Sequence, residues 1–185
     1  GRERAWRSVW AVSPSDVWAV GAQRSVAHFD GTAWKEQKLD GIEFDLLYVA
    51  AWPGEVLVTA GGNELHRFDG KTWKIERPPE LQNASLHRIW GLSPHDLYVQ
   101  VSKGKAGPPV IAHFDGSKWQ LVTLGDKTGT VYAIHGSAAD DIWAAGKTTK
   151  GFGEGGQLLH FDGKTWTQAA LPVDVPLSDV YATSK

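Results

Sequence analysis

The sequence predicts an all-β protein built from repeated units, and two observations support this prediction. First, the motif His-Phe-Asp-Gly-x-x-Trp occurs four times, with Arg replacing His in one copy, and its aspartates are 39, 46 and 47 residues apart. Second, short runs rich in Val, Trp, Tyr and Phe lie between the motifs, separated by Gly, Pro and Asp turn signals. Four such runs in about 40–47 residues are typical of a β-propeller blade, and no helical period is sustained.

We therefore expect four blades in chain order, each with strands a to d from the innermost to the outermost. The predicted blades span 5–40, 43–78, 85–124 and 130–171. Residues 177–183 (LSDVYAT) match the first strand of a repeat, so we expect them to form strand a of a fifth blade. Four blades can close a ring, but this extra strand favours a segment of a larger ring, or one that a second copy or a partner completes.

The repeated motif is predicted to form the c–d hairpin of each blade. Gly supplies the positive φ angle of the tight turn, and the Asp carboxylate can accept nearby backbone N–H bonds. The Trp then begins strand d and can lie on the adjacent blade, where burial of one indole is worth about 4–6 kcal/mol gross. We assign a structural role to the Asp and Trp of each motif, namely Asp30, Trp34, Asp69, Trp73, Asp115, Trp119, Asp162 and Trp166.

Two further columns of mostly aromatic residues are predicted, one in strand a and one in strand b. The strand a column consists of Trp10, Tyr48, Trp90, His135 and Tyr181, and the strand b column of Trp18, Leu57, Tyr98 and Trp143. Most of the ten Trp residues are thereby assigned to packing.

The units SVWAVSPSDVWAVG (8–21), RIWGLSPHDLYVQV (88–101) and AIHGSAADDIWAAG (133–146), together with the HFDGxxW motif, resemble a bacterial family of Trp-rich repeat propellers. That family is common in cell-envelope and secreted proteins, so the resemblance implies such a location, but it implies no single activity. The hairpin is also similar to the Asp-box of sialidase-type propellers, although Gly follows Asp directly and Trp comes one residue early. The Asp-box is itself a structural turn.

Composition and spacing argue against several classes of function. The net charge is −2 and there is no Lys/Arg run, which argues against a nucleic-acid partner. No apolar stretch is long enough to span a membrane, and the absence of Cys excludes thiolate chemistry. His28, His113 and His160 occupy one position in three different blades, so we expect them to pack or cap rather than bind a metal. We predict no cofactor and no catalytic residue.

Function is expected where the repeats differ. The b–c connections of the third and fourth predicted blades are expanded at Lys103–Pro109 and Lys147–Gly156, and we expect both to be loops on the b–c/d–a face. A second set of positions, near the mouth of the central channel, is polar and different in every copy, and lines either a ligand pocket or a solvated rim. The candidate binding residues are Arg7, Asp45, His87, Tyr132, Lys103, Lys105, Lys147, Lys150, Phe152 and Glu154, with Ser178 at the channel position of the extra strand.

These features predict a non-enzymatic recognition or scaffold module that binds a protein or a glycan through the b–c/d–a loop face. The alternative is a propeller hydrolase acting on glycans, which requires carboxylates that converge in one pocket. The sequence offers only Glu43, Asp45 and Glu154 as such a group. Self-association or further blades are expected to close the ring.

Overall fold

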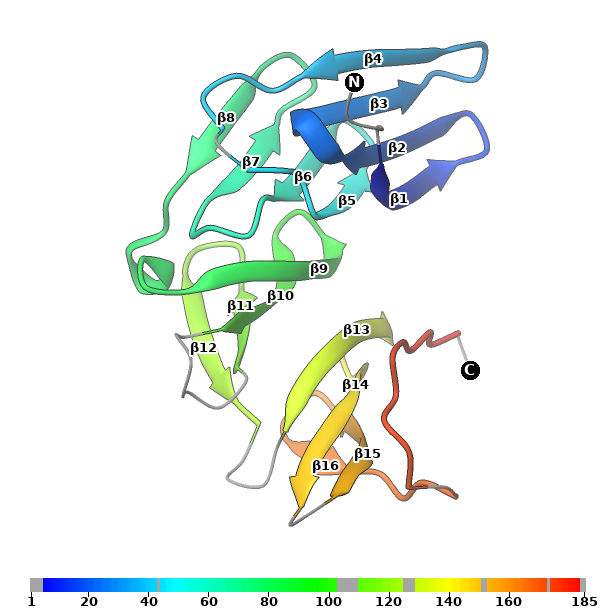
Figure 1. The fold of residues 1–185 in the computed structure, drawn as a ribbon, viewed down its shortest axis with the longest axis vertical. Helices are drawn as coiled ribbons and strands as arrows, with labels where there is room; N and C mark the ends of the chain where they lie inside the picture. The colour runs from blue at the N-terminus through cyan, green and yellow to red at the C-terminus, as the bar shows by residue number, and fades with distance from the viewer. Residues whose placement is uncertain are drawn as a thin grey trace. The chain divides into compact units, whose positions relative to one another are not determined.

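A computed structural model describes residues 5–42, 44–102, 110–124, 129–150, 153–172 and 174–183, without the side chains of 123, 149–150 and 153–154. These residues form four antiparallel sheets of four strands each, in which every strand pairs with its neighbour in sequence (Figure 1). The only helical segments in the described part of the chain are the short 3-10 turns Ala22–Arg24 and Pro79–Leu81. The predicted all-β blade architecture is confirmed.

The strands follow the predicted repeats. The first sheet contains β1 (Trp6–Ser13), β2 (Asp16–Gly21), β3 (Ser25–Phe29) and β4 (Trp34–Lys38), and the second contains β5 (Tyr48–Trp52), β6 (Glu55–Thr59), β7 (Leu65–Phe68) and β8 (Trp73–Glu76). The third contains β9 (Ser85–Ser93), β10 (Asp96–Ser102), β11 (Val110–Phe114) and β12 (Trp119–Thr123), and the fourth contains β13 (Thr130–Ala138), β14 (Asp141–Lys150), β15 (Gly153–Phe161) and β16 (Trp166–Gln168). The chain divides into two compact units, Gly1–Ile89 and Trp90–Lys185.

In the first unit, the two sheets pack face to face through an apolar core. Trp18, Val20 and Val26 come from the first sheet, and Val49 and Val58 from the second. Strand β2 is largely buried, whereas the outer strand β4 is exposed along its whole length. Burial on both faces explains why the inner strands are nearly continuous apolar runs, and the charged residues of β4 keep its free edge from pairing with other chains.

Aromatic rings join the two sheets of the first unit. The rings of Phe68 and Trp73, from the second sheet, lie 5.7 and 6.5 Å from the ring of Trp18, and the Trp73 contact is edge-to-face at 77°. Closer to the inner strands, the rings of Trp10 and Trp52 are 6.2 Å apart. The motif Trp of one blade thus packs on strand b of the preceding blade.

The predicted strand a column is wrong at Tyr48. The β5–β6 register places Ala50 opposite Leu57, while Tyr48 lies two residues earlier, opposite Thr59. The prediction required the a–b connection of the second blade to be one residue longer than that of the first. It is one residue shorter, because an irregularity between Ala11 and Ser13 adds a residue to the first sheet and the β5–β6 pairing has none. Trp52 supplies the ring that contacts Trp10 instead.

The predicted loop at 147–156 is also wrong, because most of it is an extension of the β14–β15 ladder. Lys147 pairs with Gly156, and the pairing continues as far as Lys150 and Gly153. The glycines permit close packing: a Cβ atom at Gly155 or Gly156 would collide with Asp174 or with the backbone of Val175. The Asp174 carboxylate also accepts a hydrogen bond from Gly156 N, at 3.1 Å. Here glycine marks a close approach of two segments.

The segment 177–183 lies in the position of a next strand a, but it forms no β-ladder with the described residues. Leu177 N donates to Gly146 O at 3.0 Å, which repeats the bond from Leu46 N to Gly21 O at 3.1 Å. The Tyr181 ring lies 4.3 Å from the His135 ring, and the latter lies 5.5 Å from Trp90. A ladder requires a strand b beside this segment, and none is described there.

The exposure of the motif Trp predicts unequal effects of its removal. Trp73 is half-buried against Trp18, whereas 54% of the surface of Trp34 is exposed. We expect Trp73→Ala to lower the free energy of unfolding by about 2–4 kcal/mol, because it leaves a cavity between the sheets. Trp34→Ala, at the same repeat position, should cost less than about 1 kcal/mol. Urea unfolding followed by circular dichroism measures both, and equal losses would contradict the packing described above.

Candidate recognition surface

The three repeated histidines are each held by an aspartate and a stacked ring. The Nε2 atoms of His28, His113 and His160 lie 2.9, 2.8 and 2.9 Å from an Oδ1 atom of the aspartate that begins strand b in the same blade. The opposing ring of strand b stacks on each imidazole at 4.0, 4.3 and 4.2 Å between centroids. The aspartates are Asp16, Asp96 and Asp141, and the rings are Trp18, Tyr98 and Trp143. This arrangement fixes the orientation of the ring that the next blade contacts.

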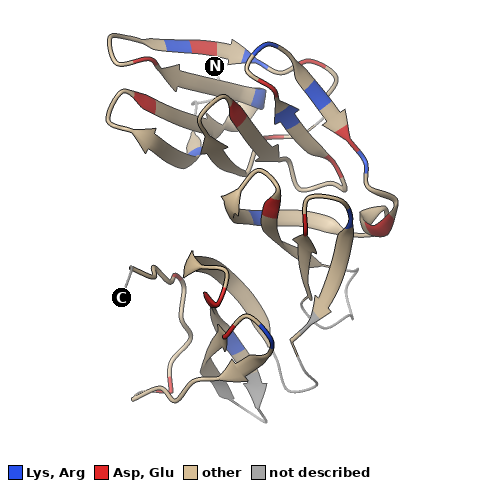
Figure 2. Cartoon of the chain, turned by 180° about the vertical axis from the view of Figure 1, so that it is seen from behind, with Lys and Arg blue, Asp and Glu red and all other residues tan. Residues whose placement is uncertain are grey.

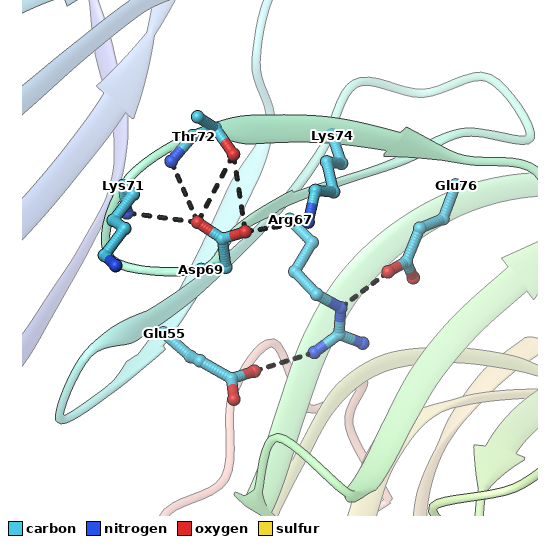
Figure 3. Close-up of polar contacts among 7 residues, drawn as sticks. All are labelled: Glu55, Arg67, Asp69, Lys71, Thr72, Lys74 and Glu76. Carbon is cyan, nitrogen blue, oxygen red and sulfur yellow. Dashed lines mark hydrogen bonds and ion pairs between the residues drawn. The ribbon is translucent and has the colours of Figure 1, made fainter.

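The second sheet replaces this arrangement with an ion-pair network. Arg67 stands at the histidine position, opposite Leu57, and Glu55 stands at the aspartate position. Arg67 donates from Nη1 to Glu55 at 3.1 Å and from Nε to Glu76 at 2.7 Å (Figure 3). The Arg67 side chain is longer than histidine and the Glu55 side chain is longer than aspartate, so both members of the pair differ from those of the other sheets. Among the described residues, no group of His, Cys, Asp or Glu has the arrangement of a metal site.

The motif aspartates serve their turns. Asp69 accepts backbone N–H bonds from Lys71 at 3.1 Å and Thr72 at 2.9 Å, and it also pairs with Lys74 at 2.8 Å (Figure 3). The glycine after each motif aspartate has a positive φ, between 84° and 90°. Hydrogen bonds to the ionised carboxylate lower the pKa of all four motif aspartates, that of Asp115 to about 2. The largest contribution to the lowered pKa comes from the side chain of Lys35 at Asp30, of Lys74 at Asp69 and of Ser117 at Asp115, and from the backbone N–H of Thr165 at Asp162. Equivalent bonds occur at Asp30, Asp115 and Asp162.

Two of the predicted channel residues meet in the first unit. Arg7 Nη2 lies 2.8 Å from Asp45 Oδ2, and the two side chains are 44% and 42% exposed, respectively. The other oxygen of Asp45 accepts a 2.9 Å bond from Gln23 N. Gln23 and Arg24 have φ angles of 58° and 62°, a conformation that non-glycine residues adopt at a cost. Asp45 thus ties β1, the 3-10 turn and the loop before β5 together.

The remaining predicted residues are distributed differently. His87 is half-buried, burial lowers the pKa of its imidazole, and its carbonyl accepts the Thr59 hydroxyl at 2.8 Å. Tyr132 lies on β13 and Ser178 in the C-terminal segment, both in the second unit. Lys147, Lys150 and Glu154 lie on the extended β14–β15 ladder. Lys103, Lys105 and Phe152 lie outside the described residues, as does Glu43 of the proposed carboxylate group.

The loop Ile42–Leu46 also presents an exposed aromatic residue that was not predicted. Phe44 is 59% exposed and directly precedes Asp45. Ile42 O accepts a 3.3 Å bond from Arg24 Nη1, so the loop is fixed to the 3-10 turn on both sides of Phe44. The sequence signal was an apolar residue in a d–a loop whose neighbours differ among the repeats.

A cleft between the two sheets of the first unit lies next to this loop. It has a volume of about 290 Å³ and is lined by Gln37–Asp40, His66 and Trp73–Ile75. His66 is 2% exposed, its Nε2 has no hydrogen bond, and burial lowers the pKa of the imidazole. Arg24 O accepts a bond from Leu39 N at 3.1 Å, which connects the cleft wall to the 3-10 turn. The repeats contained the signal, because the positions equivalent to His66 are Ala27, Ala112 and Leu159.

Basic and acidic residues are interspersed along the strands and turns (Figure 2). No helix in the described part of the chain is long and apolar enough to cross a membrane. The interspersed charges agree with the absence of a basic run in the sequence.

The Arg67 network predicts a compensated mutant series. Arg67→Met should lower the free energy of unfolding by about 1–2 kcal/mol, because it leaves Glu55 and Glu76 near each other without their shared cation. Adding Glu55→Gln and Glu76→Gln should recover part of that loss, since no uncompensated charge remains. Thermal and urea unfolding of the single and triple variants measure this, and a triple variant less stable than Arg67→Met would contradict it.

The turn aspartates predict a loss of stability in acid. Their pKa values are lowered in the folded state from the usual value near about 4, so their contribution is complete above about pH 4 and is lost as the pH falls toward about 2. Asp115→Asn should therefore show a shallower fall in the free energy of unfolding over this range than the unsubstituted protein. Asp40→Asn, at an exposed aspartate outside the four motif hairpins, is the control. Identical pH profiles for all three proteins would refute the assignment.

The chain matches no protein-family profile and no curated protein. Among solved structures, it is similar to YCF48 bound to D1 peptide, with a TM-score of 0.66 and 16% identity over 97% of this chain and 57% of that one. For YCF48 from Cyanidioschyzon merolae, the TM-score is 0.63 and the identity 15%, over 96% of this chain and 59% of that one. For a calcium-binding protein, regucalcin, from Agrobacterium tumefaciens, the TM-score is 0.57 and the identity 11%, over 88% of this chain and 58% of that one. The chain thus spans somewhat more than half the length of these proteins, and the likeness shows a β-propeller fold.

Proposed function

We propose that this chain is a non-enzymatic recognition module that binds a protein segment through the b–c/d–a loop face of its first unit. The observation that carries the proposal is the exposed Phe44, which is held beside the Arg7–Asp45 ion pair. Aromatic residues and Arg are the most frequent energetic anchors of protein interfaces. Here an anchor of each kind lies within one short stretch of surface.

Two hydrogen bonds tie residues before and after Phe44 to the 3-10 turn, which favours binding. The bonds from Gln23 N to Asp45 and from Arg24 Nη1 to Ile42 O fix the loop on either side of Phe44. A preorganised surface loses less conformational entropy when a partner binds. The adjacent cleft, with Lys38 and Asp40 in its wall, offers charged groups that can orient a peptide chain. A likeness in fold to YCF48, whose structure was solved with a D1 peptide, is consistent with a peptide as the ligand.

The alternative, glycan hydrolysis, has no specific observation in its favour. It requires two carboxyl groups within roughly 5–10 Å of each other, one of them an acid with a raised pKa. Of the three carboxylates predicted for it, only Asp45 has a described side chain, and that side chain is bonded to Arg7 and Gln23.

We also propose a location in the bacterial cell envelope or the secreted space, as the resemblance to the repeat family implies.

Display of a random peptide library, with the purified chain as bait, tests the proposal. Peptides selected on the unsubstituted protein should bind Phe44→Ala at least about tenfold more weakly, the loss expected for an interface anchor. Trp34→Ala, which removes an exposed aromatic residue from another surface, should leave their affinity unchanged. A glycan array serves as the comparison. Equal binding to both variants, or binding of glycans but of no peptide, would overturn the proposal.

A further inference from the structure

A second surface, distinct from the loop face, is the apolar side of the first sheet that faces away from the second. In the second sheet, Val49, Phe68 and Trp73 face the first sheet and form the contact between them. By register, their equivalents in the first sheet are Val9, Phe29 and Trp34. Val9 is 66% exposed and Trp34 is 54% exposed, and Phe29 is half-buried with its ring 5.5 Å from that of Trp34. A shallow hollow of about 500 Å³ is lined by Val9 and Trp34, among others.

The fourth sheet has the complementary surface, also incompletely covered. In the first sheet, Trp18 and Val26 receive Phe68 and Trp73 and are 6% and 0% exposed. The equivalent residues of the fourth sheet are Trp143 and Leu158, and both are only half-buried. The first and fourth sheets thus carry the two matching halves of one interface.

The C-terminal segment partly occupies the second of these surfaces. Tyr181 lies on His135, as an incoming strand a ring would, but it remains 77% exposed. The segment is held by this ring contact and by two hydrogen bonds, from Leu177 N to Gly146 O and from Ala182 N to His135 Nδ1. Strand β1, in contrast, pairs with β2 along its whole length. In a competition for the same place, the C-terminal segment is the weaker of the two.

We propose that two copies of this chain associate head to tail, with the first sheet of one copy docked on the fourth sheet of the other. Phe29 and Trp34 of the incoming sheet then cover Trp143 and Leu158, in the manner of Phe68 and Trp73 on Trp18. Trp10 of the incoming sheet takes the place of Tyr181 on His135, and the C-terminal segment is released. The contact joins two different surfaces, so it can close a ring or extend a chain, and dimers and larger species both fit.

Sedimentation velocity over a range of concentrations tests this inference. The unsubstituted chain should form dimers or larger species, and Trp34→Glu or Leu158→Glu should each raise the dissociation constant at least about 30-fold, the effect of losing one interface anchor. Tyr181→Ala should lower it about fivefold, because it weakens the segment that competes for the site. Phe44→Glu, which places the same charge on the loop face, is the control and should have no effect. Circular dichroism and thermal unfolding establish that each variant is folded.

A mixing experiment distinguishes the head-to-tail contact from a symmetric one. Trp34→Glu and Leu158→Glu chains, each dissociated alone, should associate when mixed, because one chain retains an intact first sheet and the other an intact fourth sheet. Three results would overturn the proposal. The first is that the unsubstituted and Tyr181→Ala chains are both monomeric at every concentration. The second is that only one of the two glutamate substitutions weakens association, and the third is that the mixture stays dissociated. Peptide binding through Phe44 is measured separately, so the two proposals can fail independently.

Discussion

Ring contacts between successive sheets are the interaction on which this structure depends. A four-stranded blade is apolar on both faces and cannot bury them alone, so each blade needs a neighbour. Trp73 meets this need by packing edge-to-face on Trp18, and the stacked His28 with its partner Asp16 holds the Trp18 ring in place. The repeated histidine and aspartate therefore support the interface indirectly, because they orient the strand b ring that the next blade covers.

The second sheet shows which part of this arrangement is constrained. It uses Leu57, Arg67 and Glu55 where the other sheets use a ring, a histidine and an aspartate, yet its strands b and c pair in the same register. The requirement is thus a flat apolar surface on strand b and a paired polar group on strand c, and more than one chemistry satisfies it. Departures from the repeat elsewhere, such as Phe44 and His66, are not compensated in this way. Phe44 lies in the loop before β5, where we propose that a ligand binds, and His66 lines the adjacent cleft with its Nε2 3.7 Å from Glu64 Oε2.

Sequence reasoning predicted the features that recur in every repeat, and it failed for features that depend on single residues. The Asp-Gly turns, the strand order and the motif Trp follow from spacing and turn chemistry, and they could be predicted. The register of β5 could not, because the irregularity that lengthens the first a–b connection by one residue is absent from the second, and the composition does not show this. Glycines at 155 and 156 suggested a loop, whereas they permit contact with Asp174. The repeat placed Arg7 and Asp45 at equivalent positions near the channel mouth, but it could not show that their side chains form an ion pair, because the residue at that position differs in every copy.

A double-mutant cycle on Trp18 and Trp73 tests most directly whether ring contacts hold the blades together. Free energies of unfolding are measured for the unsubstituted chain, for Trp18→Ala, for Trp73→Ala and for the double variant. Each single substitution removes the edge-to-face contact as well as its own burial, so the losses should overlap in the double variant, with a coupling energy of about 0.5–1.5 kcal/mol. Strictly additive losses would show that the two rings do not stabilise each other, and would contradict this account of how the blades are joined.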